Sequence, residues 1–431
     1  MSWKEVTIGS FLRERPDRIE PNQANFLGLK RIEKIDFSGN IYLADNTSTR
    51  TNMILVKPGD LVISGINVAK GALAVYEGKE DVLATIHYSS YEFDKSVIDI
   101  EYLKWFLISN KFMNILKEQV GGGIKTELKP KKFLSLKIKL PDINLQKEIA
   151  KKINNVYDEI ELLKVTNEEN YELISKLRQS ILQEAVQGKL VPQDPNDEPA
   201  SVLLERIKEE KERLIKEGKI KKEKPLPPIS EDEIPYELPE GWEWVRLGEV
   251  TNYAYNETLK PDEIDEEEWV LELEDIEKDT SRLIQVIRNK DRKSKSNKNR
   301  FYKGDVLYGK LRPYLKKVLV APEDGVCSTE IIPFRGYGNI ESRYIMYIMK
   351  SPYIDKIVNS ITHGMNMPRL GTKNALELLI PLPPINEQKR IVEKVDQLMA
   401  LCDELEKNIE QSKKDCELLI QSVLQEAFKE A

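Results

Sequence analysis

The sequence predicts an α+β protein in which two similar mixed α/β blocks are each followed by one long helix. The segment LPDINLQKEIAKKI at 140–153 reappears as LPPINEQKRIVEKV at 382–395. The segment QSILQEA at 179–185 reappears as QSVLQEA at 421–427, at the same offset of 242 positions. No residue is gained or lost between these landmarks. A helix explains this constancy, because one insertion would rotate all later side chains by about 100°.

Apolar residues advance by alternating fours and threes along both copies, as they do in a coiled-coil seam. The seam residues are Ile149, Ile153, Val156, Ile160, Leu163, Ile174, Leu177 and Ile181 in the first copy and Ile391, Val395, Leu398, Cys402, Leu405, Ile409, Cys416, Leu419 and Val423 in the second. A helix from Asn144 to Gln187 would be about 65 Å long at roughly 1.5 Å per residue, so each copy needs a partner, and the nearest candidate is the other copy. The first seam is polar in its middle, at Asn167 and Asn170, and a buried Asn there would fix the register.

The first block, residues 1–139, mixes short strands with turns. Residues 53–64 predict a strand, a Pro-Gly-Asp turn and a second strand, and residues 71–78 predict a further strand. A helix is expected over 101–119, and an alternating strand precedes the first long helix, residues 140–188. Asn144 is expected to cap that helix, as Asn386 caps the second.

Residues 189–240 form a linker rich in proline and charge, with one exposed helix over 201–217. The second block, residues 241–380, then repeats the first. WKEVTIG at 3–9 corresponds to WEWVRLG at 242–248, and GDLVIS at 59–64 corresponds to GDVLYG at 304–309. A helix is expected over 344–361, followed by the second long helix, residues 381–431. Insertions fall inside the blocks only, so the long helices are expected to set a distance while the blocks vary.

The charge is unevenly distributed. The net charge is −7, but residues 1–140 carry 21 Lys and Arg against 17 Asp and Glu, and residues 241–380 carry 22 against 22. The acidity therefore lies on the linker and the long helices. There is no apolar run of membrane-span or signal-peptide length, which favours a cytoplasmic protein without a membrane partner. Three cysteines and two histidines leave no recognisable zinc site.

The chain is expected to catalyse nothing alone. GDVLYGKL at 304–311 nearly matches a phosphate-binding P-loop, but Leu311 stands where Ser or Thr would hold magnesium. No methyltransferase motif and no Ser-His or Cys-His arrangement is visible.

Two cationic stretches of the second block are candidate nucleic-acid ligands. Residues 288–303, RNKDRKSKSNKNRFYK, carry eight basic residues against one acid, and from them we select Lys298 and Arg300 as phosphate ligands. A solvated loop is the alternative. In YGKLRPYLKK the candidates are Lys310, Arg312 and Lys316; Arg312 could bond two acceptors on one guanine edge. A structural salt bridge is an equal alternative for it.

Two glycine-led loops before the last strand of each block are comparable. They place Lys125 and Thr126 in the first block and Asn366 and Arg369 in the second as further candidate DNA ligands. Hinge-like turns are the alternative for both loops.

These motifs together resemble the specificity (S) subunits of type I restriction and modification systems, over the whole chain. The resemblance rests on the duplicated LPxIxxQxxI and QSxLQEA motifs, on GKLVPQDPNDEPASVLLERI from Gly188, on LPEGWEWVRLGE from Leu238, and on GDVLYGKLRPYLKKV with CSTEIIPF. The first block departs from it, with SGINVAKGALAV where the second has YGKLRPYLKKV.

The resemblance implies two target recognition domains, each reading one half of an asymmetric, split site on double-stranded DNA. It implies that the long helices pack as an antiparallel coiled coil under a pseudo-twofold axis and bind two modification (M) subunits. Those subunits bring S-adenosylmethionine, and restriction (R) subunits use ATP and magnesium, so no cofactor is expected on this chain. The competing hypothesis is a coiled-coil scaffold that joins protein partners without touching DNA.

Overall fold

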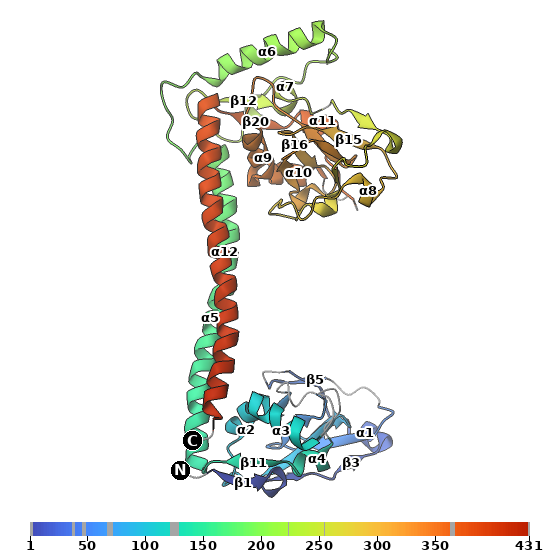
Figure 1. Ribbon diagram of the computed structural model, residues 1–431, viewed down its shortest axis with the longest axis vertical. Helices are drawn as coiled ribbons and strands as arrows, with labels where there is room; N and C mark the ends of the chain where they lie inside the picture. Colours follow the sequence, from blue (N-terminus) through green and yellow to red (C-terminus); the bar gives the residue numbers. More distant parts are fainter. Residues whose placement is uncertain are drawn as a thin grey trace. The chain divides into compact units, whose positions relative to one another are not determined.

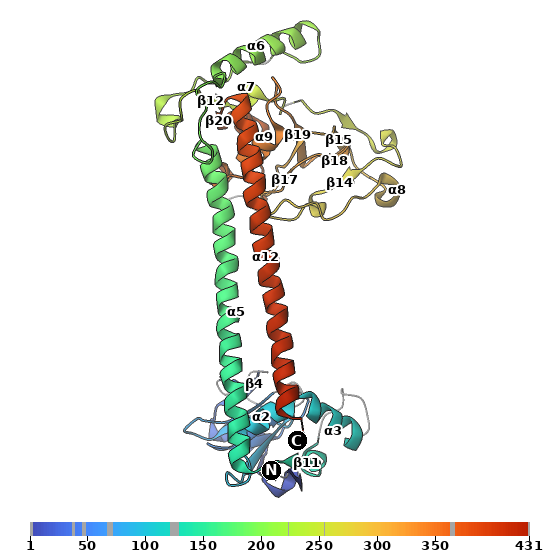
Figure 2. The same cartoon turned by 60° about the vertical axis from the view of Figure 1, so that its left-hand side comes forward.

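The computed structural model describes residues 3–36, 39–44, 49–66, 72–120, 129–222, 224–253, 255–362 and 367–429. The chain forms two compact units. Unit 1 consists of Met1–Glu169 with Ile409–Ala431, and unit 2 consists of Asn170–Asn408. Figures 1 and 2 label their helices and strands. Each unit therefore contains one of the two blocks and part of both long helices.

The described residues of unit 1 form three sheets, which confirms the α+β prediction. Strands β1 (Lys4–Thr7) and β11 (Lys137–Leu140) pair antiparallel. A four-stranded sheet has the order β2 (Leu12–Glu14), β10 (Tyr88–Phe93), β7 (Leu61–Ser64), β8 (Leu73–Val75). A five-stranded sheet has the order β3 (Arg18–Ile19), β6 (Met53–Val56), β9 (Val82–Thr85), β4 (Arg31–Ile35), β5 (Ile41–Ala44). Its helices before α5 are α1 (Pro21–Leu27), α2 (Ile100–Ile108), α3 (Asn110–Val120) and α4 (Pro130–Leu134).

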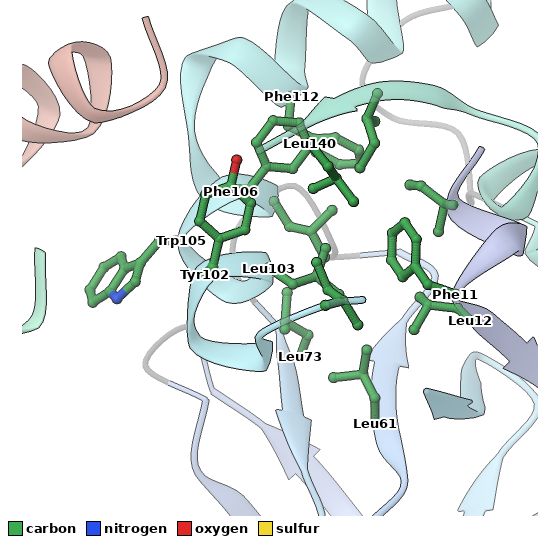
Figure 3. Packing of buried hydrophobic residues seen from close by; sticks show 14 of the residues in the cluster. Phe11, Leu12, Leu61, Leu73, Tyr102, Leu103, Trp105, Phe106, Phe112 and Leu140 are labelled. Atoms are coloured by element: carbon green, nitrogen blue, oxygen red, sulfur yellow. The ribbon is translucent and has the colours of Figure 1, made fainter. Parts of the chain in front are cut away.

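Helix α2 contributes several residues to the hydrophobic core of unit 1. Its buried face packs Tyr102, Leu103 and Phe106 over the four-stranded sheet, where Leu61 and Leu73 lie in the same cluster (Figure 3). Phe428, just beyond the end of α12 (Ile385–Ala427), meets the rings of Tyr102 and Phe106 edge-on at 5.4 and 5.5 Å. Burial of such aromatic side chains removes a large apolar area from water and stabilises the unit.

Unit 2 repeats this plan. Strands β12 (Glu243–Arg246) and β20 (Leu379–Leu382) pair as β1 and β11 do. A three-stranded sheet has the order β17 (Val318–Val320), β16 (Val306–Gly309), β19 (Ile331–Phe334), and a four-stranded sheet the order β13 (Thr258–Leu259), β15 (Lys298–Phe301), β18 (Gly325–Ser328), β14 (Val270–Leu271). Helices α7 (Leu247–Val250), α8 (Asn289–Arg292), α9 (Ser342–Lys350), α10 (Pro352–Thr362) and α11 (Thr372–Leu376) complete the block.

The linker helix α6 (Ala200–Lys216) lies on unit 2, and its bounds confirm the helix predicted over 201–217. Its buried side chains Leu203 and Ile207 pack against Gly338. The Gly338 backbone N–H donates to Glu210 Oε2 at 2.7 Å. The apolar face of this helix is therefore satisfied within the unit.

The helices predicted over 101–119 and 344–361 are each broken in two, at Ser109 and Ser351. Both serines have extended backbones, and each hydroxyl donates to the carbonyl three residues earlier, at 2.6 and 2.7 Å. Each hydroxyl also accepts from the backbone N–H three residues later, at 3.3 Å. One side chain therefore closes one helix and caps the next, which the apolar periodicity alone did not reveal.

The two copies of the long-helix motif are α5 (Ile143–Val186) and α12, each continuous. In unit 1, Asn167 of α5 donates to Ser412 Oγ of α12 at 3.0 Å; in unit 2, Arg178 of α5 pairs with Asp403 of α12 at 2.6 Å. Within unit 1, Ile153 of α5 lies in the same cluster as Leu424 of α12, whereas Asn167 meets Ser412, so the two helices run antiparallel there. Of the two polar seam residues, Asn167 is buried as predicted, whereas the prediction is wrong for Asn170, which is exposed.

The predicted seam is buried mainly along one column, and Ile391 of α12 is buried outside it. On α5 this column consists of Ile153, Ile160, Asn167, Ile174 and Ile181, seven residues apart. The second predicted column is wrong in part, because Leu163, Leu177, Leu405 and Leu419 are about half exposed. A helix with one partner helix buries the column that faces it and leaves the next column at the edge.

The caps predicted at Asn144 and Asn386 are wrong, because both residues lie inside their helices. Asp142 accepts instead, from the backbone N–H groups of Asn144 and Leu145 at 3.0 and 3.1 Å. The repeated Gln of the LPxIxxQ motif is buried at both helix starts. Gln146 and Gln388 donate to Pro141 and Pro383 carbonyls at 2.9 and 3.0 Å, and each accepts a backbone N–H that precedes α2 or α9. This glutamine explains the motif, since it ties each long helix to its block.

Candidate nucleic-acid interface

The same turn supports a hairpin in both blocks. Gly59 and Gly304 have φ values of 86° and 88°, a region that favours glycine. The following Asp accepts from a backbone N–H three residues earlier, Asp60 from Lys57 at 3.1 Å and Asp305 from Tyr302 at 2.8 Å. Each carboxylate is buried and also accepts from an arginine Nε at 2.6 Å. Strands β7 and β16 therefore each follow a rigid turn, which fixes the direction in which the strand leads into its loop.

In unit 2, β16 leads into the hairpin loop, residues 310–317. Arg312 and Lys316 have left-handed backbones, with φ values of 50° and 52°, on either side of a 3-10 turn at Pro313–Leu315. The loop is bonded to the adjoining segment, residues 367–370. The Arg312 N–H donates to the Pro368 carbonyl at 2.8 Å, and the Leu370 N–H donates to the Lys310 carbonyl at 3.0 Å. Lys310, Arg312 and Arg369, selected from two distant stretches of sequence, are thus brought together.

The side chains at this junction differ in freedom. Arg312 is exposed, and its guanidinium has no hydrogen-bond or ion-pair partner among the residues that the structure describes. Tyr314, beside it, is 44% exposed. Arg369 is held by Glu330, with Nε 3.0 Å from the carboxylate, but remains half-exposed. No described residue pairs with the five N–H donors of Arg312, whereas Arg369 would have to give up its partner to bind anything else.

Lys316 turns inward. Its Nζ lies 3.0 Å from Asp355 of α10 and donates to Gln179 of α5 at 3.3 Å, and the side chain is only 14% exposed. Lys316 is therefore a brace of the hairpin loop rather than a free phosphate ligand, which corrects its assignment. The signal in the sequence was weak, because Asp355 and Gln179 lie far from it along the chain.

The basic stretch 288–303 is largely neutralised, and the expectation of a free cationic loop is wrong for most of it. Its ion pairs are Arg288–Glu323, Lys290–Glu267, Arg292–Asp275, Lys298–Glu272 and Arg300–Glu268. Lys298 is only 5% exposed and Arg300 makes two bonds to one carboxylate, at 2.9 and 3.3 Å. Both residues are structural cations in strand β15, so they are withdrawn as candidate phosphate ligands. Lys293, Lys295 and Lys303 stay exposed and without ion pairs among the described residues.

Asp275 shows how strongly this stretch is anchored. Its side chain is completely buried and accepts from Arg292, from Gln285 at 2.8 Å and from the Glu272 backbone N–H at 2.8 Å. Burial raises the pKa of Asp275, but these hydrogen bonds outweigh it, so the pKa lies below its ordinary value. The acidic residues that precede the basic stretch in the sequence were the signal from which this pairing could have been predicted.

Three selected residues, Lys125, Thr126 and Asn366, lie outside the described residues. Their candidate role stays a prediction. Part of the first block's counterpart of the hairpin loop, residues 67–71, lies outside them too.

Within the described ranges, no three His, Cys, Asp or Glu side chains gather into a metal site. No helix in this part of the chain combines the length and apolar character that a membrane span requires. Cys327, Cys402 and Cys416 are free and buried. The arrangement offers exposed hydrogen-bond donors and cations on a rigid hairpin, which suits recognition better than catalysis.

Comparison with known proteins gives one family. The profile described as "Type I restriction modification DNA specificity domain" matches residues 24–170 and 239–412. The EcoAI type I restriction enzyme specificity subunit of Escherichia coli is 38% identical over 265 residues, 56% of this chain and 42% of that protein. The EcoEI specificity subunit of Escherichia coli is 40% identical over 245 residues, 54% of this chain and 40% of that protein. The match thus spans less than half the length of these two relatives.

A third relative and two solved structures match over nearly the whole chain. The EcoDI specificity subunit of Escherichia coli is 24% identical over all of this chain and 88% of that protein. A chain from a structure of a type I R-M system complex has a TM-score of 0.65 at 16% identity, covering 99% of this chain and 97% of that one. The HsdS subunit of Thermoanaerobacter tengcongensis has a TM-score of 0.57 at 16% identity, covering 99% and 96%. These structures support the fold.

Proposed function

This chain belongs to the family of type I restriction modification DNA specificity domains, and from that premise we propose that it selects the DNA target of a type I restriction-modification complex. Each block reads one half of a split site on double-stranded DNA. The chain itself is not an enzyme; methylation and cleavage belong to partner subunits.

The main observation behind this proposal is that the two blocks share one scaffold but differ in the loops that it holds. Both blocks contain the Gly-Asp turn, the hairpin that follows it and the serine-broken helix pair. The residues that leave the hairpin differ, SGINVAKGALAV in the first block and YGKLRPYLKKV in the second. A repeated support with unlike contact loops suits an asymmetric target, because base choice depends on loop side chains and not on the scaffold.

In unit 2 the reading residue is Arg312, with Lys310 and Tyr314 beside it. An exposed guanidinium without a partner can donate two parallel hydrogen bonds to the O6 and N7 atoms of one guanine. Lys310 is half-buried, and its ammonium suits a phosphate that sets the register of the loop. We assign the exposed Lys293, Lys295 and Lys303 the same phosphate-binding role in place of Lys298 and Arg300.

The long helices supply docking sites for two modification subunits. Leu163 and Leu419 in unit 1 and Leu177 and Leu405 in unit 2 are about half exposed, and each pair combines one leucine from each helix copy. Exposed leucines repeated in this way mark an interaction surface that occurs once per unit. S-adenosylmethionine would be bound by the modification subunits, and ATP and magnesium by the restriction subunits. Because the proposed target is DNA, we propose that the chain acts in the cytoplasm.

The test combines the chain with its modification subunits and determines their target by methylome sequencing of the host. Binding to labelled duplexes is then measured against salt concentration, because neutralised phosphates predict a steep loss of affinity as salt rises. Replacing residues 1–139 with the block of another family member should change one half of the target and leave the other half intact.

The alternative function, a coiled-coil scaffold without DNA contact, predicts the opposite results. Absent or salt-independent duplex binding by the assembled complex would favour the scaffold. A target that stays unchanged after the block exchange would refute the assignment of half-sites to blocks.

A further inference from the structure

Backbone strain is concentrated beside the hairpin loop of unit 2. Six non-glycine residues in the described part of the chain have positive φ values. Four of them lie in two adjoining loops: Asp279 and Ser281, at 62° and 61°, and Arg312 and Lys316 of the hairpin loop. A left-handed backbone is unfavourable for a non-glycine residue, and such strain persists only where surrounding contacts impose it.

The contacts that impose it come from residues 277–283, which we call the buttress loop. The Asp279 backbone N–H donates to the Leu315 carbonyl at 2.9 Å. The Ser281 hydroxyl donates to the Lys316 carbonyl and accepts from the Val318 backbone N–H at 3.1 Å. Ser281 is 8% exposed, so its hydroxyl replaces water for two backbone groups of the hairpin loop.

The buttress loop is itself fixed. Its Glu277 N–H donates to the Arg282 carbonyl at 2.8 Å, and its Ser281 N–H donates to the Glu277 carbonyl at 3.1 Å, which closes the loop on itself. Lys350, at the end of α9, donates to the Thr280 carbonyl at 2.8 Å. The hairpin loop thus has a support tied to α9 on one side, and Lys316 ties it to α10 and α5 on the other.

We propose that the buttress loop is a specificity-determining element and that Ser281 is its positioning residue, which sets the orientation of Arg312 through the hairpin loop without contacting a base. This inference rests on the proposed function and extends it to residues behind the reading surface. A hydrogen bond between a side chain and a particular base depends on its direction. A loop that relaxes therefore loses discrimination between bases before it loses phosphate contacts.

The buttress loop has no cationic role of its own in this scheme. Its Arg282 pairs with Glu277 at 3.3 Å, so its charges largely cancel. Changes at Ser281 should therefore leave non-specific, salt-sensitive binding intact, in contrast to changes at a phosphate ligand.

The experiment uses the complex of the full chain with its modification subunits and duplexes that carry the target found by methylome sequencing. Ser281→Ala removes both hydroxyl bonds. Ser281→Gly also removes them, but it relieves the left-handed strain, so its thermal stability should stay close to that of the wild type. Ser294→Ala is the matched control, because the buried hydroxyl of this half-buried residue has no partner among the described residues.

Both Ser281 variants should lose at least about fivefold in discrimination against base changes in the half-site read by unit 2. Discrimination at the other half-site, the dissociation constant for non-specific DNA and the Ser294→Ala control should stay within about twofold of the wild type. Normal discrimination by Ser281→Gly, or an equal loss at both half-sites, would overturn the proposal. A wild-type complex without any sequence preference would instead overturn the proposed function itself, so the two failures are distinguishable.

Discussion

The contrast between Arg300 and Arg312 gives the sharpest test of the interface. Arg300 and its partner Glu268 are 22% and 13% exposed and share two hydrogen bonds. Arg300→Ala leaves the Glu268 carboxylate nearly buried and unpaired, which should cost about 2–3 kcal/mol of unfolding free energy. For a domain of this size that is a fall in Tm of roughly 5–10 °C. Non-specific DNA affinity and its salt dependence should not change.

Arg312→Ala should do the reverse. The side chain is exposed and unpaired among the described residues, and alanine shares the strain of its positive φ, so stability should change by less than about 0.5 kcal/mol. Loss of a bidentate guanine contact should weaken discrimination at one position by about 1–3 kcal/mol, a factor of roughly 5 to 150.

The assay pairs thermal unfolding of each variant with anisotropy titrations of the assembled complex on target, mutated and unrelated duplexes. Arg206→Ala, which removes a half-exposed arginine from α6, is the control for the loss of one surface charge. A reduced salt slope with unchanged Tm for Arg300→Ala would show that it binds phosphate. A lowered Tm with intact discrimination for Arg312→Ala would show that it is structural.

The remaining predictions concern stability. Asp275→Asn should destabilise unit 2 by about 3 kcal/mol, because it weakens the buried partner of Arg292, and a loss under 1 kcal/mol in chemical denaturation would contradict this. Burial and nearby cations lower the pKa of Lys350 to about 8, so the folded state loses its proton first as pH rises. Between pH 8 and 10, the unfolding free energy of the wild type should therefore rise by roughly 2 kcal/mol relative to that of Lys350→Met. If the Tm values of the two proteins change in parallel over this pH range, the charge at Lys350 is not buried. Asn167→Ile removes the polar contact with Ser412 from the seam and should raise the Tm of the chain by a few degrees; a fall would show that the pair stabilises the helices.

The long helices could be predicted from the sequence because their signals are local. The constant offset and the seven-residue recurrence can be seen directly in the sequence. Both helices are continuous over the residues where this pattern predicts them. The breaks at Ser109 and Ser351 also have local causes, a serine followed by Asn110 or Pro352, but the apolar stripe continues through both breaks and concealed them. A stripe reports which face is buried and not where the backbone turns.

The candidate site was less predictable because its decisive contacts join distant segments. Lys298 and Arg300 look free in the sequence, and only the fold brings Glu272 and Glu268 to them. The pairing of the hairpin loop with residues 367–370 is equally non-local. Arg312 is predicted from its guanidinium, which can bond two acceptors on one guanine edge, and the structure adds the reason that it is available: no described residue neutralises it.

The two buried aspartates beside the hairpins have a consequence for recombination between genes of this family. Asp60 meets Arg15, which follows β2, whereas Asp305 meets Arg335, which follows β19. The arginine therefore follows a different strand in each half, because β19 pairs directly with β16 whereas β10 separates β2 from β7. An alignment of the halves would show no shared cation. A crossover between residues 15 and 60 could leave a buried carboxylate without its counter-ion, at a cost of about 3 kcal/mol or more. Exchanges at the helix boundaries keep each aspartate with its own arginine, so new specificities should arise from whole-block shuffling far more often than from mosaics within a block.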